Sequence, residues 1–173
     1  MSAQLFFGLD VGRSSIKIVQ LAPEGKAKKL VSLGALPSPL GELTSGSDAD
    51  LATYAQLIKK LIKDLKITTN LVNISLPESK IFTRVIEMPV ISDEELASAL
   101  KWEAEQYIPV PLEEVNLDWQ VLERPENPTP DSKMSVLLGA APKTVINRYV
   151  KLGEVSGLNI VSLEPETIAL SRS

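Results

Sequence analysis

The chain has 173 residues, a formal net charge of −4, 44% hydrophobic residues, and neither Cys nor His. Zinc sites and Cys or Ser–His nucleophiles need those residue types, so the composition excludes these classes of chemistry. The mild acidity argues against a nucleic-acid-binding protein, for which a basic stripe is expected. No apolar run reaches the ~18–20 residues of a membrane span, and no basic segment precedes the apolar N-terminal stretch. We therefore expect a soluble intracellular protein.

The first 77 residues predict a β-β-β-α-β unit. Short segments rich in apolar and β-branched residues flank a polar turn, which is typical of a hairpin, and a later segment has apolar residues at helical spacings. Asp48 or Asp50 is the expected helix cap, and the preceding stretch rich in Pro, Gly and Ser predicts an exposed loop. The expected elements are, in chain order, strands at 5–10, 16–21 and 30–35, a loop at 36–47, a helix reaching 65 and a strand at 71–76.

A second unit, of order β-α-β-β-α, is expected over residues 80–157. Ser92 followed by Glu95 is a capping-box signature, and it opens a helix that runs to Tyr107. Trp102 lies off the apolar face of this helix, whose predicted buried stripe is Leu96, Leu100, Ala104 and Tyr107. The other expected elements are strands at 81–88, 115–122 and 134–140, a helix at 143–155 that ends at Gly157, and a following strand at 158–163.

The segment Gly8–Lys17 holds the residues best suited to bind a ligand. A hairpin turn directs backbone N–H groups, hydroxyls and an ammonium toward one concavity, which suits an anion such as a phosphate. Asp10 is the expected carboxylate for a hydrated Mg²⁺, and Gly12 permits close approach of the backbone. The alternative interpretation is a polar β-turn whose lysine is simply solvated. The predicted cofactor-binding residues are Asp10, Gly12, Arg13, Ser14, Ser15 and Lys17.

Two motifs resemble known families. The segment Gly8–Lys17, which reads GLDVGRSSIK, is similar to the first phosphate motif of the actin, Hsp70 and sugar-kinase superfamily, whose usual form is Asp-x-Gly-Ser/Thr. The segment Lys101–Val115, which reads KWEAEQYIPVPLEEV, is similar to the signature of the PilM family, the cytoplasmic FtsA-like proteins of type IV pilus assembly. This resemblance implies an α/β fold with an actin-like subdomain, 1A, at 1–77 and 158–173. It also implies an inserted α+β subdomain of the FtsA-like 1C type at 80–157.

The resemblance also makes Glu164 the candidate catalytic residue. In Hsp70-like enzymes the acid of a Glu-Pro pair that opens a helix orients the attacking water, and Glu164 precedes Pro165. The alternative is an ordinary acid at a helix start, which stabilises the helix without chemistry. Arg13 departs from the superfamily, which favours Ser or Thr there, so it either pairs with a phosphate or points away.

The second half of an actin-like protein has no counterpart in this sequence. The second phosphate motif, the adenosine motif and subdomains 2A and 2B are missing, so we expect either an N-terminal fragment or a naturally short form. The resemblance then implies ATP and Mg²⁺ binding in a full-length form, with weak or absent binding by this chain. The sequence leaves enzymatic activity open and argues against it for the chain alone, which has half a nucleotide site; a weak ATPase activity would need the missing second half.

The function that the resemblance implies is a cytoplasmic scaffold, recruited to the cytoplasmic face of the inner membrane. It is expected to grip the short N-terminal peptide of a bitopic membrane protein, PilN in the family, in a groove between 1A and 1C, with Trp102 as a candidate contact. Other inner-membrane pilus components are expected partners, nucleic acid is not, and membrane contact is expected only through the partner. The alternatives are the N-terminal half of a superfamily ATPase or kinase, and an FtsA-like cell-division adaptor.

Overall fold

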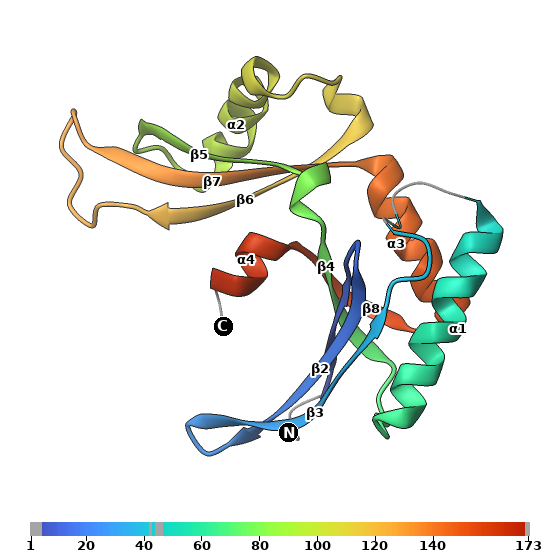
Figure 1. Ribbon diagram of the computed structural model, residues 1–173. Coiled ribbons are helices and arrows are strands. Elements are labelled where there is room, and N and C mark those ends of the chain that lie inside the picture. The colour runs from blue at the N-terminus through green and yellow to red at the C-terminus, as the bar shows by residue number, and fades with distance from the viewer. Residues whose placement is uncertain (1–4, 42, 44–46, 172–173) are drawn as a thin grey trace. The chain divides into compact units, whose positions relative to one another are not determined.

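The computed structural model describes residues 5–41, 43 and 47–171, which form two compact units (Figure 1). Unit 1 consists of Met1–Glu78 and Val145–Ser173, and unit 2 consists of Ser79–Thr144. Among the described residues, no helix is long and apolar enough to span a bilayer.

Unit 1 is built on a five-stranded mixed sheet in the order β3-β2-β1-β4-β8. The first three strands are antiparallel neighbours, whereas β4 runs parallel to both β1 and β8. This arrangement confirms the predicted hairpin and the strand after the first helix. The elements are β1 (Phe7–Val11), β2 (Ser15–Glu24), β3 (Ala27–Pro37), α1 (Asp48–Asp64), β4 (Leu71–Leu76), α3 (Lys143–Ser156) from Val145 on, β8 (Asn159–Pro165) and α4 (Glu166–Ser171). A 3₁₀ turn (Glu78–Lys80) spans the boundary at which the chain passes into unit 2.

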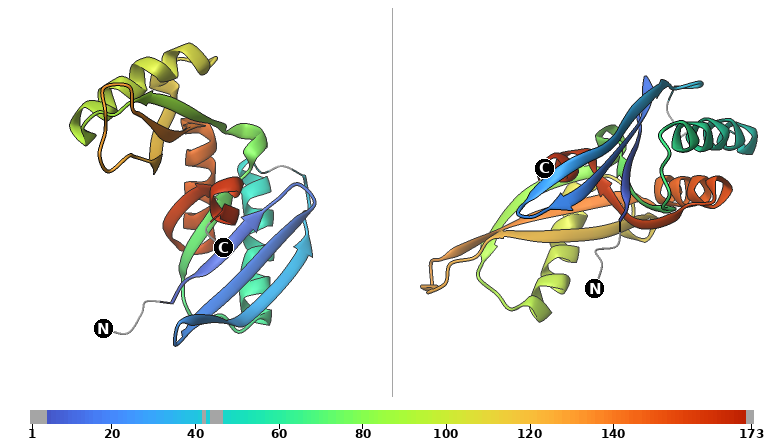
Figure 2. Two further views of the ribbon diagram at one scale, coloured as in Figure 1. Left: turned by 90° about the vertical axis from the view of Figure 1, so that its left-hand side faces the viewer. Right: turned by 90° about the horizontal axis from the view of Figure 1, so that it is seen from below.

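The two faces of this sheet have different roles. Alternate side chains of β1 and β2, such as Phe7, Leu9 and Ile18, are buried against α1 and α3, which lie side by side on one face (Figure 2). Because successive side chains of a strand point to opposite faces, Asp10 and Lys17 lie on the other face. The helix α4 lies on that second face, which we call the cavity face (Figure 2). The hydrophobic alternation thus places the polar residues together.

The helix α3 lies in unit 1, whereas the sequence predicted it as the end of the insert. Tyr149 and Leu152 of α3 are fully buried, and the Tyr149 hydroxyl lies 3.4 Å from the carbonyl oxygen of Val11. At Gly153 a Cβ would lie only 2.7 Å from Cδ1 of Ile160, so α3 and β8 approach closely. Long-range packing of this kind, which the order of elements does not reveal, sets the unit boundary. Gly157, with φ of +73°, ends the helix as predicted.

Two local predictions for unit 1 were wrong. The cap of α1 is Ser47, whose side chain accepts the N–H of Asp50, because the cap is the residue just before the first helical position. In the predicted exposed loop at 36–47, Leu43 is buried. The Tyr54 hydroxyl also donates to the carbonyl of Gly41 at 2.6 Å. The loop positions 42 and 44–46, and the ends 1–4 and 172–173 of the predicted 1A subdomain, lie outside the described residues.

Unit 2 is an antiparallel three-stranded sheet, in the order β5-β7-β6, with α2 packed on one face. Ser92 and Glu95 form the predicted capping box, in which the Glu95 carboxylate accepts the Ser92 N–H at 3.1 Å. Eleven buried side chains form its core: Ile86, Met88, Leu96, Leu100, Ala104, Ile108, Val115, Met134, Val136, Leu138 and Ala140. The elements are β5 (Phe82–Pro89), α2 (Asp93–Tyr107), a 3₁₀ turn (Leu112–Glu114), β6 (Val115–Glu123) and β7 (Lys133–Pro142).

The aromatic residues of α2 only partly follow the predicted pattern. Tyr107 was expected in the buried stripe, but it is 41% exposed, and its ring lies under the Arg84 guanidinium at 3.9 Å. Ile108, the next residue, takes the buried position instead, because the helix ends at Tyr107 and the chain turns there. Trp102 is 66% exposed, as its place off the apolar face predicted.

Candidate functional site

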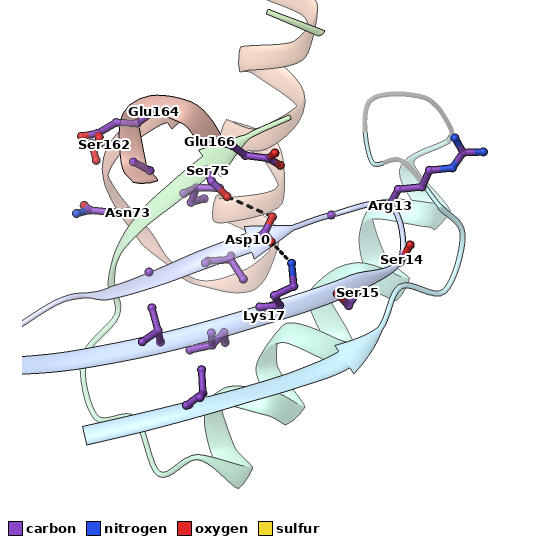
Figure 3. Close-up of a pocket in the computed structure, with 18 residues that line it drawn as sticks. Asp10, Arg13, Ser14, Ser15, Lys17, Asn73, Ser75, Ser162, Glu164 and Glu166 are labelled. Carbon is purple, nitrogen blue, oxygen red and sulfur yellow. Dashed lines mark hydrogen bonds and ion pairs between the residues drawn. The ribbon is translucent and has the colours of Figure 1, made fainter. Parts of the chain in front are cut away.

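A cavity of about 800 Å³ opens on the cavity face of unit 1 (Figure 3). Residues from β1, β2, β3, β4, β8 and α4, together with the turn between β1 and β2, line it. All seven residues that the sequence singled out as cofactor-binding or catalytic are among its lining residues: Asp10, Gly12, Arg13, Ser14, Ser15, Lys17 and Glu164.

The polar centre of the cavity is a row of residues on four adjacent strands. Strand pairing aligns Lys17 with Asp10, Asp10 with Ser75, and Ser75 with Glu164. The Lys17 ammonium donates to one oxygen of the Asp10 carboxylate at 2.7 Å, and the Ser75 hydroxyl donates to the other at 3.2 Å. Both oxygens of Asp10 are thus held, which fixes the direction of the carboxylate (Figure 3).

The turn between β1 and β2 is held by its own backbone and by the end of β3. The Gly12 N–H donates to the carbonyl of Ser15 at 3.0 Å, and the Ser38 hydroxyl donates to the carbonyl of Gly12 at 2.6 Å. The Ser38 N–H also donates to the carbonyl of Ser14 at 3.0 Å. A Cβ at Gly12 would lie 3.2 Å from the Ser15 carbonyl oxygen, so this tight backbone favours glycine.

Electrostatics couple the three charged residues of the cavity. The hydrogen bond to Asp10, and then its charge, raise the pKa of Lys17, so the lysine stays protonated at neutral pH. Burial raises the pKa of Glu166, the negative charge of Asp10 raises it further, and Lys17 partly opposes the shift. Two carboxylates therefore share one ammonium, and an added cation would relieve their repulsion.

The structure separates the predicted site residues into two groups. Asp10 and Lys17 point into the cavity, whereas the Arg13 side chain extends away from them, which is the second of its two expected orientations (Figure 3). Glu164 lies within β8 and does not open a helix, because the strand continues through Pro165 and α4 begins at Glu166. In Figure 3 Glu166 is beside Asp10, whereas Glu164 lies on the Ser162 side of the cavity.

Sequence reasoning missed Ser75 and Glu166. Val72, Ile74 and Leu76 alternate with Asn73 and Ser75, so the face of Ser75 was predictable. Its pairing with Asp10 depends on a contact between residues 65 positions apart. Asn73 and Ser162 form a second polar pair beside this row, and the side-chain oxygens of both are buried without a hydrogen-bond partner among the described residues. Both residues line the same cavity.

The donor set suits a hydrated cation better than a directly bound one. Within the described part of the chain, no three Asp or Glu side chains are grouped to hold a metal ion. Mg²⁺ usually keeps several waters and takes one or two carboxylates, and Asp10 with the nearby Glu166 offers that number. The residues present therefore fit a hydrated Mg²⁺.

Comparisons with known proteins identify the family. The sequence model for the family described as type IV pilus assembly protein PilM matches residues 8–173. A solved PilM–PilN type IV pilus biogenesis complex is similar, with a TM-score of 0.82 and 30% identity. The match covers 94% of this chain and 48% of that one, so the chain spans about half the length of its solved relative.

Two further solved structures are more distant. One is the cytoplasmic domain of EpsL, an inner-membrane component of the type II secretion system of Vibrio cholerae. It is 12% identical with a TM-score of 0.60, and the match covers 96% of this chain and 59% of that one. This likeness shows the fold alone. A Bacteroides thetaiotaomicron protein with an actin-like ATPase fold is 14% identical with a TM-score of 0.44, covering 99% and 56%. The predicted α/β fold class is confirmed, and the chain belongs to the PilM family of type IV pilus assembly proteins.

Proposed function

We propose that this chain is a scaffold part of a type IV pilus assembly complex and that its cavity takes the phosphate end of a nucleotide. The observation that carries the nucleotide proposal is the Asp10–Lys17–Ser75 cluster beside the β1–β2 turn. Membership of the PilM family favours the scaffold over the kinase and cell-division alternatives.

The proposed phosphate contacts follow from the chemistry of the turn. The Lys17 ammonium supplies a charge that a phosphate would share with Asp10, and the hydroxyls of Ser14 and Ser15 line the same cavity. Asp10 would hold a hydrated Mg²⁺, which supplies the positive charge that balances the phosphates when it is bound. Arg13 and Glu164 stay candidates for the site, and the position of Glu166 makes it a second candidate acid.

The test is calorimetry with Mg·ATP on the chain and on its variants Asp10→Asn and Lys17→Met. We expect weak binding by the chain, since nothing in the predicted site holds the adenine. Each variant removes a charge-assisted contact worth about 1.5–3 kcal/mol, which is roughly a 10- to 150-fold loss of affinity. Lys63→Met, on the exposed face of α1, is the matched control and should bind as the unmodified chain does. If the unmodified chain and the three variants bind Mg·ATP with equal affinity, the β1–β2 turn is a solvated β-turn and not a phosphate site.

We also propose that the chain binds the cytoplasmic N-terminal peptide of a PilN-like bitopic protein. The support is the 30% identity to PilM of the solved PilM–PilN complex over nearly all of this chain. Trp102 is the proposed aromatic contact because 66% of its surface is exposed on α2, outside the core of unit 2. This contact would place the chain at the cytoplasmic face of the inner membrane through its partner.

The peptide proposal is tested by fluorescence anisotropy of a labelled partner peptide without nucleotide. Trp102→Ala should weaken binding by about 1–3 kcal/mol, the range of a truncated aromatic hot spot. Leu122→Ala, which also removes an exposed apolar side chain from unit 2, is the control and should leave the affinity unchanged. Binding by Trp102→Ala at full strength would remove Trp102 from the site, and no binding by the unmodified chain would refute the peptide proposal.

A further inference from the structure

The β2–β3 hairpin of unit 1 ends in a tip that packs against nothing in the described structure. From Pro23 to Val31 every residue is exposed, and Gly25, with φ of +62°, forms the turn. Figure 1 shows the turn of this hairpin standing clear of α1 and α3, and Figure 2 shows the same. We call Pro23–Val31 the hairpin tip. A two-stranded ribbon without a packed face gains little stability by itself, so its side chains are available for another contact.

The hairpin tip is basic in an acidic protein. Lys26, Lys28 and Lys29 lie within four consecutive positions, with Glu24 as the sole acid of the tip, while the whole chain has a net charge of −4. Among the ion pairs between described residues, none involves these three lysines. The tip therefore presents uncompensated positive charge on long side chains.

Large apolar side chains adjoin these lysines on both strands. Leu21 and Leu30 are register partners and are 41% and 53% exposed. Val31 is 53% exposed where the register of β2 and β3 shifts. Leu33, which is two residues further along β3 and also lines the cavity, is 64% exposed. Exposed apolar residues that gather in this way mark an interaction site more often than exposed residues scattered singly.

We propose that the hairpin tip binds an anionic lipid surface directly. The lysines would contact lipid phosphates, and Leu30 and Val31 would enter the boundary between headgroups and acyl chains. The combination matters, because stable attachment to a bilayer needs both apolar burial and basic residues. This contact goes beyond the proposed nucleotide and peptide functions, and it adds a membrane contact of the chain's own to the contact expected through the partner.

A lipid surface fits the hairpin tip better than an acidic protein does. A protein partner is usually recognised through a shaped, desolvated pocket, whereas both faces of this ribbon are exposed and its charge is spread over three flexible lysines. A bilayer recognises charge and apolar area without a defined shape. Lysine side chains can also keep their ammonium groups at the phosphates while their stems lie along apolar surface.

The test is co-sedimentation of the full chain with vesicles of phosphatidylglycerol and phosphatidylcholine, compared with phosphatidylcholine alone. Each lysine near an anionic surface contributes about fivefold to partitioning, so Lys26→Ala/Lys28→Ala/Lys29→Ala should lower it on the order of 100-fold. The matched control Lys59→Ala/Lys63→Ala/Lys143→Ala removes the same charge from exposed helical positions and should change it less than about fivefold. Added salt should weaken binding by screening.

Insertion of the hairpin tip into the bilayer is measured separately from its electrostatic attraction to the lipid surface. Because the chain has no Cys, Leu30→Cys gives a unique site for a polarity-sensitive dye, and Leu122→Cys gives a matched exposed site in unit 2. The dye at position 30 should shift to the blue with anionic vesicles, and the dye at position 122 should not. Any of three results would overturn the proposal. These are equal binding of the chain to both kinds of vesicle, an equal loss of vesicle binding in the control lysine variant, and no shift in the emission of the dye at position 30. Binding to a polyglutamate peptide without vesicle binding would overturn it in favour of an acidic protein partner.

Discussion

Replacing Leu152 by Ala tests whether α3 is part of unit 1. Leu152 is fully buried in this unit, and a buried Leu→Ala substitution costs about 2–5 kcal/mol of unfolding free energy. The urea dependence for a small unit is about 1–3 kcal/mol per molar, so the middle of both ranges predicts a fall of about 2 M in the unfolding midpoint of unit 1. Unit 2 should keep its midpoint if the two units unfold separately.

The chain offers a direct way to distinguish the two units. Its two tryptophans, Trp102 and Trp119, both lie in unit 2, so Trp fluorescence reports on unit 2, whereas far-UV circular dichroism reports on both units. Leu152→Ala should lower a circular dichroism midpoint and leave the fluorescence midpoint in place. Leu100→Ala, fully buried in the core of unit 2, is the matched control and should move the fluorescence midpoint. A fluorescence midpoint that falls fully in Leu152→Ala would contradict the assignment of α3 to unit 1.

Three further predictions concern single positions. Burial and the charge of Asp10 raise the pKa of Glu166. The stability that Glu166 contributes is therefore present below its ordinary pKa of 4.5 and is lost as pH rises through its folded-state pKa. Glu166→Gln should raise the melting temperature at pH 7 but not at pH 4. Ser92→Ala removes the cap of α2 and should cost unit 2 about 0.5–2 kcal/mol, measured by urea unfolding followed by Trp fluorescence; an unchanged midpoint would show that the cap is dispensable. Gly157→Ala meets no atom within 4 Å, but its φ of +73° should cost unit 1 about 1 kcal/mol. A urea midpoint by far-UV circular dichroism equal to that of the unmodified chain would contradict this backbone argument.

Local patterns predicted most of the fold. Phe7, Leu9 and Val11 alternate with small or polar residues, and this alternation alone places Asp10 on the face away from the helices. Ser92 and Glu95 mark the start of α2 through contacts three residues apart. Such features are visible in a single sequence because the interacting residues are neighbours in the chain.

The features that the sequence did not predict depend on distant contacts. The role of Ser75 follows from the register of β4 against β1, and the place of Glu166 follows from α4 lying over the cavity face. Tyr107 was misplaced for a different reason. Its helical spacing suits a buried stripe, but the helix ends there, and the Arg84 guanidinium covers its ring in place of the core.

The most direct test of the proposed nucleotide site is an amide NMR titration of the isotope-labelled chain with Mg·ATP. We expect the largest shifts at the backbone N–H groups of the β1–β2 turn and of Lys17, because the phosphates would lie against them. Lys17→Met should remove these shifts while leaving the rest of the spectrum unchanged. Shifts confined to other parts of the chain, or equal shifts in Lys17→Met, would contradict a phosphate site at the β1–β2 turn.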